Sequence, residues 1–181
     1  DGAYIPLPVH PDDFPQAVRA LAWLGFRGAN VTLPHKQAAY RLVDRAEPLA
    51  ERIGAVNTLI VGEDGTLEGR NTDAFGFLAG LRQQIPDWRA EAGPAVILGA
   101  GGAARGCLVA LLEAGAPAIR LVNRSLTRAE RLAAEFGAEV SVVPWSARAE
   151  ALGDAALLVN ATVLGMVGQA PLDLELGGLP A

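Results

Sequence analysis

Apolar positions recur along the chain with two different spacings, which indicates a mixture of helices and strands. In the first half, spacings of three and four residues predict helices over 13–24, from 34, over 48–53 and over 73–84. Shorter apolar or alternating runs predict strands over 3–9, 28–32, 56–61 and 66–70. The turn Glu63-Asp64-Gly65 between the last two runs is typical of a β-hairpin. The first half is therefore expected to be an α/β domain.

A second series of elements begins after residues 85–93, a stretch with Pro86, Gly93 and no clear period that is typical of a linker. Strands are predicted over 95–98, 118–122, 139–143 and 155–160, and helices over 103–113, 127–136 and 147–152. This alternation is typical of a parallel sheet with helices on both faces. We therefore predict an N-terminal α/β domain over 1–84, a linker over 85–93 and a Rossmann-like doubly wound domain over 94–181.

The predicted C-terminal domain has fewer strands than its class usually contains. Four strands are predicted before Ala181, whereas a doubly wound dinucleotide domain has about six. The chain also begins at Asp1, without an initiator Met. The expectation from the sequence is a chain truncated at both ends, with an incomplete second domain.

Composition and charge exclude several classes of function. Hydrophobic residues make up 51% and charged residues 19%, enough apolar material for a packed core. The net charge of −5 argues against nucleic acid or an anionic membrane as partner, because both require clustered cations. No apolar run approaches the ~18 residues of a membrane span. One Cys and two His favour no metal site. The prediction is a cytoplasmic monomer or homodimer that binds a small molecule.

Lys36 is the only lysine among 15 basic residues. Arginine stays protonated at any physiological pH, whereas lysine can give up a proton. One stray lysine must fall somewhere, so its neighbours decide whether it has a chemical role. Lys36 lies where a predicted strand gives way to a predicted helix, which makes it a candidate proton donor.

A glycine-rich turn follows the first strand of the second half. Gly99-Ala100-Gly101-Gly102-Ala103-Ala104 fits the pattern G-x-G-x-x-[G/A] and opens a predicted helix. The first glycine permits a tight turn, and the second lets the backbone approach a pyrophosphate at the positive end of the helix. The alternative is a glycine-rich turn without a ligand. The strand–turn–helix context favours dinucleotide binding.

The end of the next strand favours NADP over NAD. An NAD site usually places Asp or Glu there, about 20 residues after the glycines. This chain instead has Asn123, Arg124 and Ser125, with Arg128 one turn into the helix. Two guanidinium groups and a hydroxyl suit a 2′-phosphate. The alternative is a solvated basic helix start, which is an electrostatically poor placement.

Three polar loops of the first half, residues 30–36, 54–58 and 71–73, follow predicted strands. The carboxyl ends of strands are where α/β proteins bind ligands. Each asparagine in these loops could serve only turn or cap chemistry, but the three loops together favour a binding site. Asp73 opens a predicted helix, where the positive helix end keeps a carboxylate ionised, and it is a candidate partner for Lys36.

Six segments resemble the shikimate dehydrogenase family in order and in spacing. They are Asn30–Lys36, Gly54–Thr58, Asn71–Asp73, Gly99–Ala103, Asn123–Ser125 and Asn160–Thr162. The resemblance covers essentially the whole chain. It implies a dehydrogenase that reversibly reduces 3-dehydroshikimate to shikimate with NADPH, in the shikimate pathway of aromatic amino acid biosynthesis.

The resemblance also implies roles for individual residues. Lys36 and Asp73 are the implied catalytic pair. The implied contacts to substrate hydroxyls are Asn30, Thr32, Lys36, Asn57 and Asp73, with Thr72 in support. The implied cofactor residues are Gly99, Ala100, Gly101, Gly102 and Ala103 for the pyrophosphate, Asn123, Arg124, Ser125 and Arg128 for the adenosine phosphate, and Thr162 near the nicotinamide.

The sequence also departs from the family pattern. A Ser-x-Ser stretch that binds the substrate carboxylate in the family is not among these residues, and position 163 is Val rather than Ser or Pro. Three alternatives stay open. They are a quinate/shikimate dehydrogenase of broader specificity, a nucleotide-binding module without catalysis, and a folate-linked dehydrogenase, against which the Asn71–Asp73 loop argues.

Overall fold

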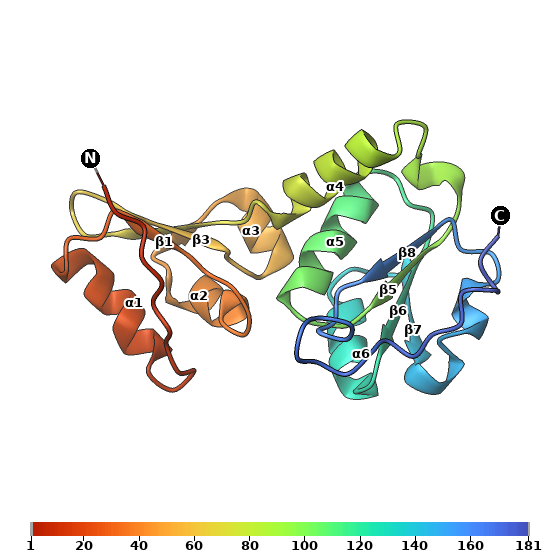
Figure 1. The fold of residues 1–181 in the computed structure, drawn as a ribbon. Helices are drawn as coiled ribbons and strands as arrows, with labels where there is room; N and C mark the ends of the chain where they lie inside the picture. Colours follow the sequence, from red (N-terminus) through yellow and green to blue (C-terminus); the bar gives the residue numbers. More distant parts are fainter. Residues whose placement is uncertain (1, 181) are drawn as a thin grey trace. The chain divides into compact units, whose positions relative to one another are not determined.

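The chain folds into two compact units, one ending at Thr72 and the other beginning at Asp73, in a computed structural model that describes residues 2–180. This division differs from the domain boundary expected at residues 85–93. The difference concerns the helix α4 (Asp73–Gln84), which packs against α5 (Gly102–Glu113) and so falls in the second unit (Figure 1).

The first unit is built on a mixed sheet of four short strands. Its elements are α1 (Phe14–Trp23), β1 (Gly28–Asn30), α2 (Lys36–Leu42), β2 (Arg45–Ala46), α3 (Pro48–Ile53), β3 (Thr58–Val61) and β4 (Leu67–Arg70). The sheet order is β1-β3-β4-β2, with β3 antiparallel to β1 and β4, and β2 parallel to β4. The predicted hairpin is confirmed as β3 and β4, and Gly65 supplies the positive φ of 82° in its turn.

The core of the first unit joins one face of α1 to the sheet. Phe14, Val18 and Leu21 are buried on α1, four and three residues apart, as expected for one face of a helix. They belong to the same apolar cluster as Leu59 of β3 and Leu67 of β4. The register aligns Asn30 with Thr58 and Thr58 with Arg70, so the ends of three strands lie side by side.

Two predictions for the first unit were wrong. Residues 3–9 are irregular rather than a strand, because Pro6 and Pro8 lack the backbone N–H groups that a strand ladder needs. The helix expected from Pro34 begins at Lys36 instead. The N–H of His35 donates to the carbonyl of Thr32 (2.9 Å), which closes a turn over these residues and delays the helix.

The second unit is the predicted parallel sheet. After α4 come a 3₁₀ turn (Ala90–Ala92), β5 (Ala95–Leu98), α5, β6 (Ile119–Asn123), α6 (Leu126–Ala134), β7 (Val140–Pro144), two 3₁₀ turns (Trp145–Ala147 and Glu150–Leu152) and β8 (Leu157–Asn160). All strand pairs are parallel in the order β7-β6-β5-β8. The chain therefore runs outward from β5 on one side and returns to pair on the other, which is doubly wound topology.

The expected helix over 147–152 is two 3₁₀ turns instead. The hydrogen bonds in this segment link residues three apart. The N–H of Arg148 donates to the carbonyl of Trp145, and the N–H of Gly153 donates to the carbonyl of Glu150. Such bonds are typical of short connectors.

Apolar clusters cover both faces of the parallel sheet. Ile97 of β5 belongs to one cluster with Leu108 and Leu121, whereas its neighbours Val96 and Leu98 belong to the other. This alternation follows from the strand period of two residues. The α/β class with a doubly wound second part is thus confirmed. Within residues 2–180, every helix is too short or too polar to cross a membrane.

Candidate functional site

Backbone hydrogen bonds join the three polar loops of the first unit. The N–H of Val31 donates to the carbonyl of Asn57 (2.7 Å), and the N–H of Val56 donates to the carbonyl of Lys36 (2.9 Å). The N–H of Asn57 donates to Arg70 (3.0 Å), at the end of β4. The structure therefore brings together the loops at 30–36, 54–58 and 71–72, as their placement at strand ends indicated.

The side chain of Asn57 fastens the third loop to the second. Its Oδ1 accepts from the N–H of Thr72 (3.1 Å) and the hydroxyl of Thr58 (2.9 Å), and its Nδ2 donates to Thr72 Oγ1 (3.0 Å). The buried Asn71 donates through Nδ2 to the carbonyl of Ala55 (2.8 Å). Both asparagines therefore take part in the turn chemistry of these loops. Of the predicted substrate residues, Asn30, Thr32 and Thr72 are exposed and Lys36 is half-buried.

A groove of about 570 Å³ in the first unit includes Asn30 and Thr32 among its lining residues. Most of its wall is apolar, contributed by residues 3–9, α1 and β1. His35 also lines it, with its ring stacked on Phe14 (centroids 4.3 Å apart) and Nε2 3.0 Å from the carbonyl of Val9. Lys36 and Thr72 are not among the lining residues. Apolar walls suit a polyhydroxylated ligand poorly, so within this groove the groups that suit such a ligand are polar ones such as Asn30 and Thr32.

Gly99 and Gly101 shape the turn between β5 and α5. Gly99 has a φ of 110°, and a Cβ on it would lie 3.0 Å from the carbonyl oxygen of Ala161 and 3.2 Å from Cγ2 of Thr162. Only glycine fits there, on both conformational and spatial grounds. Gly101 caps α5 in an extended conformation, and a Cβ on it would meet only Arg128 Nη2, at 4.0 Å. The backbone of Gly101 is thus open to a ligand beside a guanidinium group.

The start of α6 brings a cation to this turn. Arg128 Nε donates to the carbonyl of Ala100 (3.0 Å). Ser125 caps α6, its Oγ accepting from the N–H of Arg128 (3.4 Å), and Asn123 Nδ2 donates to the carbonyl of Ser125 (2.9 Å). Arg124 is exposed on the same turn. An open glycine backbone, a helix N-terminus and a guanidinium group together fit a phosphate-bearing cofactor.

The loop after β8 reaches the same edge of the sheet. The N–H of Ala161 donates to the carbonyl of Leu98 (2.9 Å), which extends the pairing of β8 with β5. Asn160 Oδ1 accepts from the N–H (3.0 Å) and hydroxyl (2.6 Å) of Thr162, and Nδ2 donates to the carbonyl of Leu164 (3.0 Å). The carboxyl ends of β5, β6 and β8 therefore carry all the predicted cofactor residues, where doubly wound sheets bind ligands.

The loop-holding role of Asn160 did not emerge from the sequence, where Asn160 served only as part of a motif. An asparagine two residues before a threonine, directly after a strand, is a signal for such a local side-chain turn. Gly106 of α5 lies close to the start of α4, because a Cβ on it would be 3.3 Å from Cβ of Asp73. The sequence carries no signal for this approach, because it depends on the packing of two helices.

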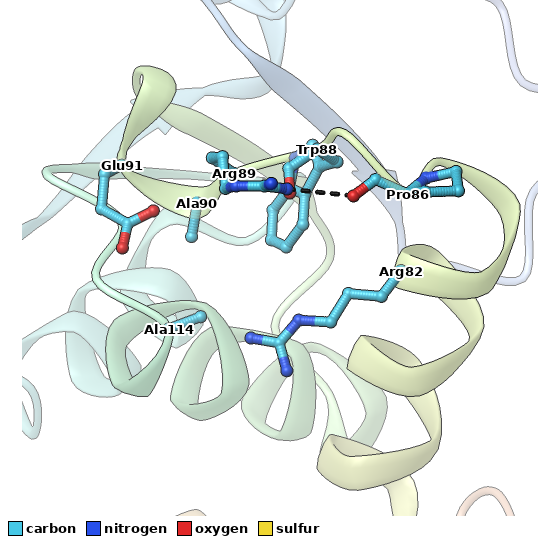
Figure 2. A pocket seen from close by; sticks show the side chains of 7 residues that line it. All are labelled: Arg82, Pro86, Trp88, Arg89, Ala90, Glu91 and Ala114. Carbon is cyan, nitrogen blue, oxygen red and sulfur yellow. Dashed lines mark hydrogen bonds between the residues drawn. The ribbon is translucent and has the colours of Figure 1, made fainter.

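A different cavity of about 290 Å³ lies before β5 rather than after it, so it faces the opposite edge of the parallel sheet. Figure 2 shows Arg82 of α4 pointing toward Ala114, with Trp88 and Arg89 on the connecting segment. Arg89 Nη1 is held by the carbonyls of Pro86 (3.0 Å) and Trp88 (2.9 Å). None of the predicted site residues lines this cavity, so it is not the candidate cofactor site. That site is the open edge of the sheet at Gly99–Ala103.

The candidate catalytic residues belong to different units. Lys36 begins α2 in the first unit, and Asp73 begins α4 in the second. Both side chains are half-buried. Each lies at the first residue of a helix, where an aspartate is electrostatically favoured and a lysine disfavoured.

Comparisons with known proteins match both parts of the chain to one family. A model of the shikimate dehydrogenase substrate binding domain matches residues 1–59, and a model of shikimate / quinate 5-dehydrogenase matches residues 81–165. The NADP(+) shikimate dehydrogenase of Paramagnetospirillum magneticum is 60% identical over 180 residues, covering 99% of this chain and 65% of that protein. The chain thus spans about 65% of the length of the curated relatives it matches.

Solved structures agree with the sequence comparisons. Shikimate 5-dehydrogenase from Thermus thermophilus, in complex with NADP(H) and shikimate, has a TM-score of 0.72 and 42% identity over 87% of this chain and 56% of that one. Quinate dehydrogenase from Corynebacterium glutamicum, in complex with NAD, has a TM-score of 0.74 and 32% identity over 85% and 56%. With the doubly wound sheet and the glycine turn at its edge, these matches establish that the chain belongs to the shikimate dehydrogenase family.

Proposed function

We propose that the protein containing this chain is an NADP-dependent shikimate dehydrogenase, which reversibly reduces 3-dehydroshikimate to shikimate in aromatic amino acid biosynthesis. The observation that carries the proposal is the edge of the parallel sheet where Gly99, Gly101 and Arg128 meet. Its support is the 60% identity to an NADP(+) shikimate dehydrogenase over nearly the whole chain.

The cofactor residues divide into three groups in this proposal. Gly99, Ala100, Gly101, Gly102 and Ala103 hold the pyrophosphate through the backbone. Asn123, Arg124, Ser125 and Arg128 hold the adenosine 2′-phosphate, since they offer two cations and no carboxylate. Thr162 lies on the nicotinamide side, next to Gly99. When bound, NADPH supplies the hydride.

The first unit, together with Asp73, supplies the substrate contacts and the proton. As hydride reaches the ketone carbon, negative charge grows on its oxygen, and the Lys36 ammonium stabilises that charge and donates the proton. Asp73 is the second member of the proposed catalytic pair and binds a hydroxyl. Asn30, Thr32 and Asn57 bind further hydroxyls, and Thr72 supports them. In the oxidative direction neutral Lys36 accepts the proton.

A quinate/shikimate dehydrogenase is the second candidate. Quinate dehydrogenase from C. glutamicum, whose structure holds NAD, has a TM-score of 0.74 to this chain. The absence of an acid among Asn123–Ser125 in the sequence opposes NAD use. We also propose a cytoplasmic location and a monomer or homodimer, which cell fractionation and sedimentation of the purified protein would test.

Initial rates separate the candidates. Oxidation of shikimate and of quinate is measured, each with NADP⁺ and with NAD⁺. We expect kcat/KM for shikimate with NADP⁺ to exceed the other three combinations by at least about tenfold. Comparable rates with quinate and NAD⁺ would favour the second candidate. Binding of NADPH without oxidation of either substrate would favour a nucleotide-binding module.

A further inference from the structure

Helices α4 and α5 lie close together at a buried glycine, Gly106 of α5. A Cβ on Gly106 would lie 3.3 Å from Cβ of Asp73 and 3.8 Å from the backbone nitrogen of Ala74. The first distance is shorter than an ordinary carbon–carbon contact. The neighbours are the first two residues of α4, so they are backbone-anchored atoms rather than the far end of a flexible side chain. A methyl group at Gly106 therefore requires the start of α4 to shift.

The two glycines inside α4 itself lack such a neighbour. A Cβ on Gly76 or on Gly80 would meet no atom within 4 Å in the described part of the chain. Glycine is a poor helix former compared with alanine, so Gly106 lowers the intrinsic stability of α5. Its close approach to Asp73 gives a spatial reason for glycine at this position, which Gly76 and Gly80 do not share.

Gly106 also connects Asp73 to the cofactor turn. Gly106 lies in α5, five residues after Gly101, the cap of this helix at the glycine turn. Asp73 is the first residue of α4, and its Cβ direction is fixed by the backbone there. The same helix that begins at the cofactor turn therefore supports the backbone from which the Asp73 carboxylate extends.

We propose that Gly106 is a positioning residue for Asp73. By leaving out a Cβ, it lets α4 begin in contact with α5, so that one packed helix pair sets the position of the carboxylate relative to the cofactor turn. This inference rests on the catalytic role proposed for Asp73. It adds a determinant of activity that contacts neither substrate nor cofactor.

The test compares Gly106→Ala with Gly80→Ala, a matched control on the exposed face of α4. The enzyme is assayed for kcat, for KM of shikimate and for NADPH affinity. A displacement of a few tenths of an ångström is expected from the 3.3 Å contact. Since about 1 Å of misplacement costs about 100-fold, we expect kcat of Gly106→Ala to fall about 3- to 10-fold. NADPH affinity should stay within about twofold, and Gly80→Ala should keep wild-type kcat.

A double-mutant cycle separates positioning from general damage to the fold. The cycle combines Gly106→Ala with Asp73→Asn. If Gly106 acts through Asp73, the alanine should cost little further kcat once the carboxylate is gone. An equal loss in both backgrounds, or a Gly106→Ala enzyme as active as Gly80→Ala, would overturn the proposal.

A structural measurement keeps the inference distinct from the proposed function. Crystal structures of wild type and Gly106→Ala should show the Asp73 Cα displaced from α5 in the variant, and an unmoved Asp73 would overturn the inference. A wild-type enzyme that does not oxidise shikimate would instead sink the proposed function, whatever the two structures show.

Discussion

The two units arrange their candidate residues by different means. In the first, side chains hold the loops, as when Asn57 bonds to Thr58 and to both the backbone and the hydroxyl of Thr72. In the second, Asn160 also holds a loop, but the glycine turn is formed by the main chain itself, with Gly99 at a φ of 110° and Gly101 extended at a helix cap. The first should therefore be sensitive to the loss of functional groups, and the second to the addition of atoms.

The largest expected effect is the loss of kcat in Lys36→Arg, a variant of the first unit that keeps the charge. In Lys36→Arg the cation is kept, but arginine does not release a proton near neutral pH. We expect kcat for shikimate oxidation to fall by about 10²- to 10⁴-fold, the usual contribution of general acid–base catalysis. Arg41→Lys, an exchange of cations on the same helix, is the control and should leave kcat unchanged. A near-normal kcat in Lys36→Arg would exclude the proton-donor role.

Adding one methyl group at Gly99 should weaken cofactor binding at the site of the second unit. In Gly99→Ala, the positive φ costs about 1–2 kcal/mol, and the new Cβ presses on the carbonyl of Ala161. We expect NADPH to bind at least about tenfold more weakly, measured by fluorescence titration. Gly168→Ala is a control with a positive φ of 77° but no atom within 4 Å of its added Cβ in the described part of the chain, and it should bind NADPH normally. Equal losses in both variants would assign the effect to backbone strain alone.

The two arginines of the cofactor edge should differ in which cofactor they affect. Arg124 is exposed, whereas Arg128 also donates to the carbonyl of Ala100. Arg124→Ala should weaken NADP⁺ binding about 10-fold and leave NAD⁺ binding unchanged. Arg128→Ala should weaken both, because the glycine turn loses a bond. Titration of both variants with both cofactors checks this, and unchanged NADP⁺ binding in both would contradict the assignment of the 2′-phosphate.

Asn57 and Asn160 provide a matched pair, since the side chain of each makes at least three hydrogen bonds within the loops of its own unit. We expect Asn57→Ala to lower the free energy of unfolding by about 1–3 kcal/mol and to raise KM for shikimate. Asn160→Ala, at an exposed position, should cost less stability and raise KM for NADP⁺. Steady-state kinetics and urea denaturation of both variants test whether Asn57 affects the substrate and Asn160 the cofactor. If either variant changed the KM for shikimate and the KM for NADP⁺ equally, this assignment would be wrong.

The smallest expected effect concerns an ion pair away from both sites. Hydrogen bonding to Arg120 lowers the pKa of Asp154 from its ordinary value of 3.8. A depressed pKa contributes stability above 3.8 that is lost as the pH falls through the folded-state pKa. Asp154→Asn should therefore lower Tm at pH 7, by about 1–2 °C for an exposed pair, with a difference that shrinks below pH 3.8. Asp87→Asn, at another exposed carboxylate, is the control. A difference that persists at low pH would exclude the ion pair as its cause.

Sequence predicted some elements of both units with the observed bounds, namely α3, α4 and β5. An apolar run before a glycine turn predicted β5, and an apolar face behind an aspartate in the first turn predicted α4. Residues 3–9 were mistaken for a strand, because their apolar spacing outweighed Pro6 and Pro8 in that prediction. The polar loops of the first unit were found by their position after strands, whereas the partners of Asn57 depend on which strands pair.

The bond from Arg128 to Ala100 has a consequence for changing the coenzyme by mutation. The residue proposed to select the extra phosphate also helps to close the turn that any dinucleotide would need. Replacing Arg128 first would therefore lower the affinity for both NADP and NAD before a preference for NAD could arise. Arg124 makes no such bond among the described residues, so it is the safer first substitution. To obtain an NAD-using variant, Arg128 should be replaced only after another side chain has been introduced that donates to the Ala100 carbonyl.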